Sequence, residues 1–260
     1  MSATKPAATQ PMSDSQALRY SRHVMLPSLD FDGQERILGS HIVIVGMGGL
    51  GCAVAPYLAG SGVGRLTLID NDTIDRSNLQ RQILYRESDI GKSKAKTAAA
   101  RLRELNSDIQ INAVSERLTA ENIKSYLTDA DVVIDCCDNL MTRNLINQTC
   151  WLQKIPLVSG AAIRFEGQIA VYPMQPNTPC YACFSQLFGE QQLTCMEAGV
   201  FSPVVGVVGA LQATEALKLI AQVGEPLSGT LLLYDAAQAT WQRLTLPRAS
   251  NCPVCADSAE

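Results

Sequence analysis

A glycine-rich turn early in the chain has the residue types and spacing of a phosphate-binding loop. Gly46, Gly48 and Gly51 form a G-x-G-x-x-G pattern after a β-branched run that predicts a strand. Such glycines allow a tight turn and a close backbone approach, and the next helix presents its positive end to an anion. Asp70 follows about 20 residues later, where a carboxylate can accept hydrogen bonds from ribose hydroxyls. These features alone are equally typical of an NAD-dependent dehydrogenase.

Cationic and amide side chains beyond Asp70 favour a nucleotide with more phosphate charge. Arg81 can bind phosphate oxygens with two parallel hydrogen bonds, and Lys94 adds a second positive charge. Either cation taken alone is more often a solvated surface charge. Asn78 and Gln80 place amides beside Arg81, and the combination predicts a triphosphate site.

A second polar pair, Asp138 and Asn139, follows a predicted buried strand. Open α/β sheets place their ligand crevice at the carboxyl ends of such strands. Mg²⁺ near a polyphosphate is usually held by one or two carboxylates together with phosphate oxygens. We therefore predict that Asp138 binds Mg²⁺. The alternative is that Asp138 only caps the following helix.

Four of the nine cysteines form two C-x-x-C pairs, a spacing that lets two thiolates from one turn reach a single ion. The two pairs are Cys180 with Cys183 and Cys252 with Cys255. Together they predict a closed four-cysteine Zn²⁺ site with a structural role, which would join the C-terminal tail to the segment near residue 180. A thioredoxin-like redox pair and free buried cysteines are the alternatives.

Alternating strand and helix signals must position these side chains. We expect strands at residues 41–46, 65–69, 109–114 and 131–136, with helices at 52–59, 92–105 and 121–127. This order predicts an α/β fold with a Rossmann-like, doubly wound, mostly parallel sheet. After residue 156 the expected strands are 157–160, 167–172 and 230–234, with a helix around 206–221. We expect them to continue the same sheet with a mixed or antiparallel edge.

Composition is that of an ordinary globular protein. The 260 residues are 47% hydrophobic and 18% charged, with a net charge of -4, and no basic stripe indicates nucleic acid as a partner. Residues 1–15 are predicted to be a disordered leader without a secretory signal, and residues 16–260 a single domain. The apolar stretch 204–220 is interrupted by Gln212, Glu215 and Lys218, so we expect no membrane span and a cytoplasmic protein.

In combination these motifs resemble the ubiquitin-activating-type adenylyltransferases of bacteria. The resemblance rests on the glycine turn, residues 77–82, residues 135–139 and the paired cysteines, and it extends from about Arg19 to Cys255. Residues 157–164 and 193–200 favour the molybdopterin branch of this family. Residues 19–22 and 248–250 would also suit the thiamine branch.

The resemblance implies a reaction between ATP and a small ubiquitin-like sulfur carrier that ends in Gly-Gly. The terminal glycine carboxylate would attack the α-phosphate, forming an acyl-adenylate and releasing pyrophosphate. The expected carrier is the small subunit of molybdopterin synthase, and the thiamine-pathway carrier is the alternative. Such a reaction depends on positioning and electrostatics rather than on acid–base chemistry. Residues 16–155 would be the nucleotide-binding half, and residues 156–260 the carrier-binding and zinc half.

The resemblance also assigns roles to individual residues. Arg81 and Lys94 would stabilise the phosphates, Asp138 would hold Mg²⁺, and Asp70 would bind the ribose. The other expected nucleotide-binding residues are Gly46, Gly48, Gly49, Ser77, Asn78, Gln80 and Asn139.

Two residues carry less certain assignments. Arg22 would reach the ATP site of the neighbouring subunit in a homodimer, and otherwise it is a surface arginine on an amphipathic helix. Cys195 is a candidate for a covalent link to the carrier, but the chain has only two histidines and neither is near it in sequence. We favour a non-essential cysteine in a mobile loop.

Two other classes of protein compete with an adenylating enzyme. A dehydrogenase would leave Arg81, Lys94 and the cysteine pairs without a role. A non-catalytic scaffold would be expected to lack the charged nucleotide residues, all of which are present. We therefore predict an adenylyltransferase.

Overall fold

The structure is a computed structural model that describes residues 9–187 and 198–256. Its strands are β1 (His41–Val45), β2 (Arg65–Ile69), β3 (Gln110–Val114), β4 (Val132–Asp135), β5 (Leu157–Ile163), β6 (Glu166–Tyr172), β7 (Thr230–Asp235) and β8 (Thr240–Thr245). Its α-helices are α1 (Asp14–Arg19), α2 (Ser21–Val24), α3 (Asp30–Leu38), α4 (Gly49–Gly60), α5 (Lys94–Leu105), α6 (Ile123–Leu127), α7 (Leu140–Gln153), α8 (Tyr181–Ser185) and α10 (Ser202–Ala221).

The strands form one eight-stranded sheet in the order β3-β2-β1-β4-β5-β6-β7-β8. The neighbours from β3 to β5 are parallel, and those from β5 to β8 are antiparallel. This confirms the predicted Rossmann-like sheet with an antiparallel edge. The chain leaves β1 for β2 on one side and reaches β4 on the other, so the strand order reverses between β1 and β4.

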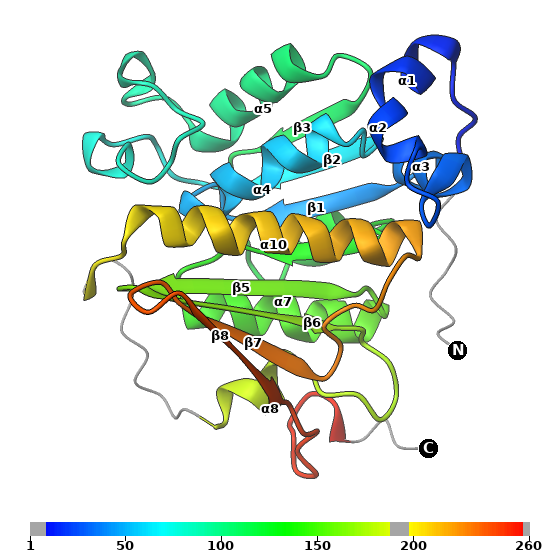
Figure 1. Ribbon diagram of the computed structural model, residues 1–260. Coiled ribbons are helices and arrows are strands. Elements are labelled where there is room, and N and C mark those ends of the chain that lie inside the picture. Colours follow the sequence, from blue (N-terminus) through cyan, green and yellow to red (C-terminus); the bar gives the residue numbers. More distant parts are fainter. Residues whose placement is uncertain (1–8, 188–197, 257–260) are drawn as a thin grey trace.

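Helices cover both faces of the sheet because the parallel strands are apolar on both sides. In β1, Ile42 and Ile44 join the core beneath α4, α5 and α10. Val43 and Val45 point to the opposite face and join the core beneath α6, α7 and α8. Figure 1 shows α10 in front of the sheet and α7 behind it.

The expected helix ranges did not include α2, α3, α7 or α8, and two further elements, β8 and α1, also differ from the sequence expectations. Strand β8 was not predicted, because all its residues are exposed and no alternation of buried and exposed positions marks it. Helix α1 begins at Asp14, inside the segment 1–15, with Ser13 as its N-cap. The side chain of Ser13 accepts a hydrogen bond from the amide of Gln16, which is the N-cap interaction that starts a helix. Residues 1–8 lie outside the described part of the chain.

Helix α10 packs on α4 and on strands β4, β5 and β6. Within the described residues it is the one helix long and apolar enough to cross a membrane by composition, yet 56% of that apolar window is buried inside the protein. Gln212 and Glu215 are also buried, and they bond the carbonyl of Asp135 and the amide of Leu227. These contacts are those of a core helix.

Gly209 sets how closely α10 approaches α4. A Cβ there would lie 2.6 Å from the Cβ of Ala53 and 2.9 Å from the carbonyl oxygen of Leu50, whereas a Cβ at Gly206 would meet nothing within 4 Å. We expect Gly209→Ala to lower the free energy of unfolding by about 1–3 kcal/mol through overpacking. The matched variant Gly206→Ala should raise it by about 0.5–1 kcal/mol through helix propensity. Urea denaturation measures both, and equal effects would contradict the close packing.

Candidate functional site

The glycine turn is held against the loop that follows β4. Gly46 has a φ of +94°, and a Cβ there would lie 2.7 Å from the carbonyl oxygen of Cys136. A Cβ at Gly51 would lie 2.1 Å from the carbonyl oxygen of Gly46. Both positions therefore require glycine. Helix α4 begins directly after Gly48, which is its N-cap and supplies no side-chain cap for the first amides.

These loops form one end of a cleft of about 1270 Å³ at the carboxyl ends of β1, β2 and β4. This is the position at which open α/β sheets bind ligands, beside the reversal of strand order. The cleft is lined by most of the predicted nucleotide-binding residues: Gly46, Gly48, Gly49, Asp70, Ser77, Asn78, Arg81, Lys94, Asp138 and Asn139. Gln80 is exposed and lies outside the lining.

Asp70 is oriented by two backbone amides. Its Oδ2 accepts a hydrogen bond of 2.7 Å from the amide of Met47, in the glycine turn. Its Oδ1 accepts one of 2.8 Å from the amide of Asp72. Burial raises the pKa of the Asp70 carboxyl, although these hydrogen bonds and Lys94 partly offset that effect. The carboxylate is thus fixed at the end of β2, next to the glycine turn.

Lys94 stands at a position where a cation is locally unfavourable. It is the first residue of α5 and only 6% exposed, so its charge lies near the positive end of the helix. Its Nζ lies 3.0 Å from Oδ2 of Asp72, whose side chain is largely exposed. An anion in the cleft would compensate Lys94 in the same way as Asp72 does here.

Arg81 is held by the loop that carries residues 75–82. The side chains of Asp75 and Asn78 bond each other's backbone amides and so fix a short 3-10 turn. Within this loop Nη1 of Arg81 donates a hydrogen bond of 3.1 Å to the carbonyl of Ser77. The loop thus brings Ser77, Asn78 and Arg81 to the same wall of the cleft.

The helix cap after β4 is Asn139 rather than Asp138. The side-chain oxygen of Asn139 accepts a hydrogen bond of 2.9 Å from the amide of Thr142 and starts α7. The alternative in which Asp138 caps this helix is therefore wrong. Asp138 is exposed on the cleft surface instead, where a carboxylate can meet a ligand.

Gln82 is a cleft residue that was not assigned a role from the sequence. It is 3% exposed and lines the cleft, and its Oε1 is buried without a hydrogen-bond partner. A Cβ at Gly48 would lie 3.7 Å from its Nε2, so the amide lies beside the glycine turn. Buried amide oxygens are rarely left unsatisfied. Its position directly after Arg81 indicated a place near the site, but the sequence could not show that the Gln82 side chain is buried there.

The cleft continues beyond these residues along the antiparallel edge of the sheet. This second half is lined by side chains of β5 to β8, among them Ile163, Glu166, Gln168, Tyr234 and Gln242. It offers both apolar and polar contacts to a ligand longer than a nucleotide.

The four paired cysteines converge in one buried cluster. Their Sγ atoms all lie within 4.8 Å of one another. Sγ of Cys180 is 3.6 Å from that of Cys252, and Sγ of Cys183 is 3.4 Å from that of Cys255. Four sulfurs at about 2.3 Å from one tetrahedral ion would be roughly 3.8 Å apart. The cluster therefore has the donor set and spacing of a metal site.

The predicted site residue Arg22, like Gln80, is not among the lining residues of this cleft. Arg22 lies on α2, is exposed, and has its Nη1 3.7 Å from Sδ of Met25. It does not line the cleft of its own chain. Cys195 lies outside the described residues.

The comparisons with known proteins agree with this geometry. The model of the ThiF family matches residues 20–254. The chain belongs to the ThiF family. It is 48% identical to the molybdopterin-synthase adenylyltransferase of Escherichia coli over 94% of this chain and 98% of that protein. It is 45% identical to the sulfur carrier protein ThiS adenylyltransferase of the same species, over 95% and 98%.

A solved structure of the same fold is that of Escherichia coli MccB with ATP. It has a TM-score of 0.79 and 27% identity, and the match covers 91% of this chain and 74% of that chain. The predicted family is thus confirmed by sequence, and the fold by structure.

Proposed function

We propose that this ThiF family member uses ATP and Mg²⁺ to adenylate the C-terminal glycine carboxylate of a ubiquitin-like sulfur carrier. The observation that carries the proposal is the single continuous cleft. One end has the glycine turn, two cations and an exposed carboxylate, and the other end extends along β5 to β8. A nucleotide and the tail of a second substrate can therefore lie end to end.

The charges of the cleft suit transfer to an α-phosphate. The amides at the start of α4 would contact phosphate oxygens, and Arg81 and Lys94 would stabilise the charge of the departing pyrophosphate. Lys94 would exchange Asp72 for a phosphate oxygen. Asp138 would hold Mg²⁺, which neutralises part of the phosphate charge when bound. Asp70 would bind the ribose.

The names of the relatives support the choice of carrier. The small subunit of molybdopterin synthase is the preferred substrate, since a relative that matches over nearly its whole length is named for that enzyme. The thiamine-pathway carrier is the second candidate, because a ThiS adenylyltransferase matches almost as well. A dehydrogenase is not favoured, because neither the family nor these relatives carry that name.

A homodimer would give Arg22 a role. Apolar side chains near it in the sequence are exposed: Leu18 on α1, and Met25 and Leu26 just after α2, are each at least half exposed. Exposed apolar side chains that gather on one surface are typical of a protein interface. In the proposed dimer these side chains would contact the second subunit and bring Arg22 to the phosphates of the ATP bound there.

The four-cysteine cluster would hold structural Zn²⁺. Thiolates are the preferred ligands of zinc in closed tetrahedral sites, and the sulfur separations fit such a site. The ion would stabilise the contact between α8 and the C-terminal turn. We also place the protein in the cytoplasm, where cysteine thiols remain reduced and available to bind a metal.

Pyrophosphate exchange into ATP tests the proposed activity. Purified protein with Mg²⁺ should catalyse exchange only when a carrier with an intact Gly-Gly end is present, and more rapidly with the molybdopterin-synthase small subunit than with the thiamine carrier. Lys94→Met should reduce exchange by about 100-fold, whereas Lys96→Met, which lies outside the cleft, should not. Absence of exchange with both carriers would refute the proposal.

Gln82 should contribute to nucleotide binding. We expect Gln82→Leu to weaken binding of ATP roughly three- to tenfold, because one hydrogen bond to the nucleotide is lost. Gln80→Leu, at an exposed position outside the cleft, should bind ATP as the wild type does. Isothermal titration calorimetry measures both, and a larger effect at Gln80 would favour the sequence-based assignment over the geometry.

Removal of one cysteine ligand should release the metal and weaken the fold. Cys183→Ala should lose most of its zinc and should unfold at a lower urea concentration, because metal binding contributes to folding free energy. The control Cys150→Ala changes a buried cysteine of α7 outside the cluster and should retain zinc. The measurement is the zinc content per chain of the wild type and of both variants. Wild-type protein that contains no zinc and takes up none would contradict the assignment.

A further inference from the structure

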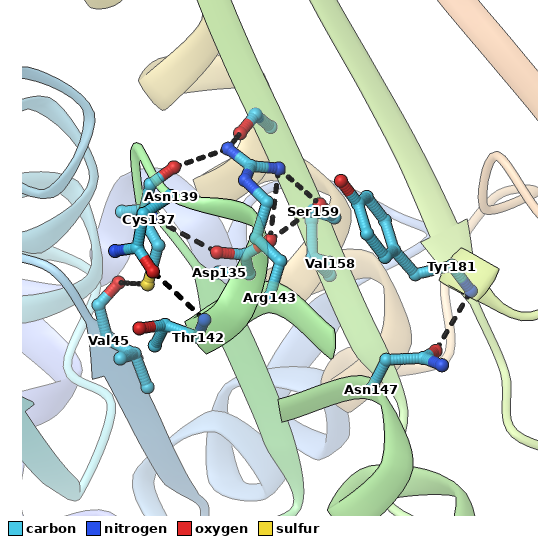
Figure 2. A network of polar contacts seen from close by, with 12 residues as sticks. Val45, Asp135, Cys137, Asn139, Thr142, Arg143, Asn147, Val158, Ser159 and Tyr181 are labelled. Atoms are coloured by element: carbon cyan, nitrogen blue, oxygen red, sulfur yellow. Dashed lines mark hydrogen bonds and ion pairs between the residues drawn. The ribbon is translucent and has the colours of Figure 1, made fainter. Parts of the chain in front are cut away.

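A buried ion pair lies at the floor of the cleft beside Asp138, and Arg143 of this pair is one of the lining residues. Nη1 of Arg143, on α7, is 3.1 Å from Oδ2 of Asp135, at the end of β4. The exposed fractions of their side chains are 7% and 1%. Ser159 on β5 completes the pair by donating to Oδ2 of Asp135 at 2.8 Å. Figure 2 shows these three residues together between α7 and the sheet.

This ion pair holds Cys137 by both of its backbone groups. Nη2 of Arg143 donates to the carbonyl of Cys137, and Oδ1 of Asp135 accepts a hydrogen bond of 3.0 Å from the amide of Cys137. Cys137 directly precedes Asp138. The direction in which the Asp138 side chain leaves the backbone is therefore fixed by the charged pair.

The same guanidinium reaches the other half of the cleft. Nη2 of Arg143 also donates to the carbonyl of Gly160 at 2.8 Å, and Nη1 donates to Oγ of Ser159 at 3.2 Å. Ala161 and Ala162, the next residues of β5, line the cleft. Arg143 thus fixes the distance between the Asp138 loop and the strand along which the second substrate would lie.

The far side of the guanidinium is closed by the cysteine-bearing segment. The ring of Tyr181 lies 5.8 Å from the Arg143 guanidinium carbon and is almost fully buried. Asn147, one helical turn after Arg143, accepts a hydrogen bond of 2.8 Å from the amide of Tyr181. Because the side chains of Arg143 and Asp135 are only 7% and 1% exposed, their electrostatic contacts are stronger than they would be in water.

A contribution to the stability of the fold does not by itself explain why a buried ion pair is present here. A buried ion pair often adds nothing over apolar side chains of similar volume, because removing two charges from water offsets their attraction. Both terminal nitrogens of Arg143 are engaged by Asp135, Ser159, Cys137 and Gly160. The guanidinium therefore acts on the cleft through the backbone it holds.

We propose that Arg143 is a positioning residue, which sets the place of the Asp138 carboxylate relative to the bound phosphates and to β5. The inference rests on the proposed function, in which Asp138 binds Mg²⁺. Partners that orient a metal ligand without touching the metal typically change metal affinity or activity 10- to 100-fold when they are lost. Loss of Arg143 should therefore resemble a milder loss of Asp138.

The test is a Mg²⁺ titration of nucleotide binding, which needs no carrier. Protein freed of Mg²⁺ but retaining its zinc is mixed with a fluorescent ATP analogue, and the Mg²⁺ concentration at half-maximal response is measured for wild type, Arg143→Lys and Asp138→Asn. Lysine keeps one positive charge, but its single nitrogen cannot take the places of both Nη1, which meets Asp135 and Ser159, and Nη2, which meets the carbonyls of Cys137 and Gly160. Leu102→Ala, in the core at α5 and away from the cleft, controls for lost stability.

We expect Arg143→Lys to raise the half-maximal Mg²⁺ concentration about tenfold and to leave nucleotide affinity without Mg²⁺ within about twofold of wild type. Leu102→Ala should lower stability and leave the Mg²⁺ dependence unchanged. If Arg143→Lys behaves as Leu102→Ala does, the residue is only structural and the inference is wrong. If Arg143→Lys does not fold, the double variant Asp135→Asn with Arg143→Gln removes both charges together, and the same shift is expected from it.

The outcome for Asp138→Asn separates the two proposals. An unchanged Mg²⁺ dependence in this variant would overturn the role of Asp138 and, with it, the inference about Arg143. If both variants show the expected shift in Mg²⁺ dependence but the wild type shows no pyrophosphate exchange with any carrier, the proposed function is overturned and the positioning role of Arg143 remains.

Discussion

The close approach of two loops at the ends of β1 and β4 is the constraint on which the cleft depends. Gly46 can lie against the carbonyl of Cys136 only because it has no side chain and adopts a positive φ. That contact brings the start of α4 beside the loop that carries Asp138. The strand order contributes the second condition for a cleft. Strands β1 and β4 are neighbours, and the connections that follow them leave in opposite directions. A crevice must therefore open between these two loops.

Two charged side chains of this crevice, Lys94 and Arg143, form ion pairs with carboxylates of the same chain. Lys94 is paired with Asp72 across the start of α5, and Asp135 is paired with Arg143 at the cleft floor. The two pairs differ in what surrounds them. Asp72 is largely exposed and can yield Lys94 to an incoming anion, whereas Asp135 and Arg143 are both buried and remain together. The first pair suits ligand binding, and the second suits a fixed scaffold.

The antiparallel edge of the sheet gives the cleft its second half. Strands β5 to β8 extend the surface past the end that carries the glycine turn, and their side chains line the cleft from Ile163 to Gln242. The cysteine cluster lies behind this edge, where α8 packs against α7 through Asn147 and Tyr181. The cysteine cluster, the cleft floor and the antiparallel strands thus share one core.

The sequence by itself determined the local features. Apolar runs of β-branched residues predicted the parallel strands, the glycine pattern predicted the tight turn before α4, and the C-x-x-C spacing predicted the cluster, because each depends on neighbours in the chain. Tertiary structure decided the features that depend on distant partners. Asn139 rather than Asp138 caps α7, Gln82 is buried while Gln80 is not, and Arg143 meets Asp135 and Gly160. Strand β8 could not be predicted, because all its residues are exposed and no alternation of buried and exposed positions marks it. Burial and hydrogen-bond partners arise only when strands far apart in sequence become neighbours.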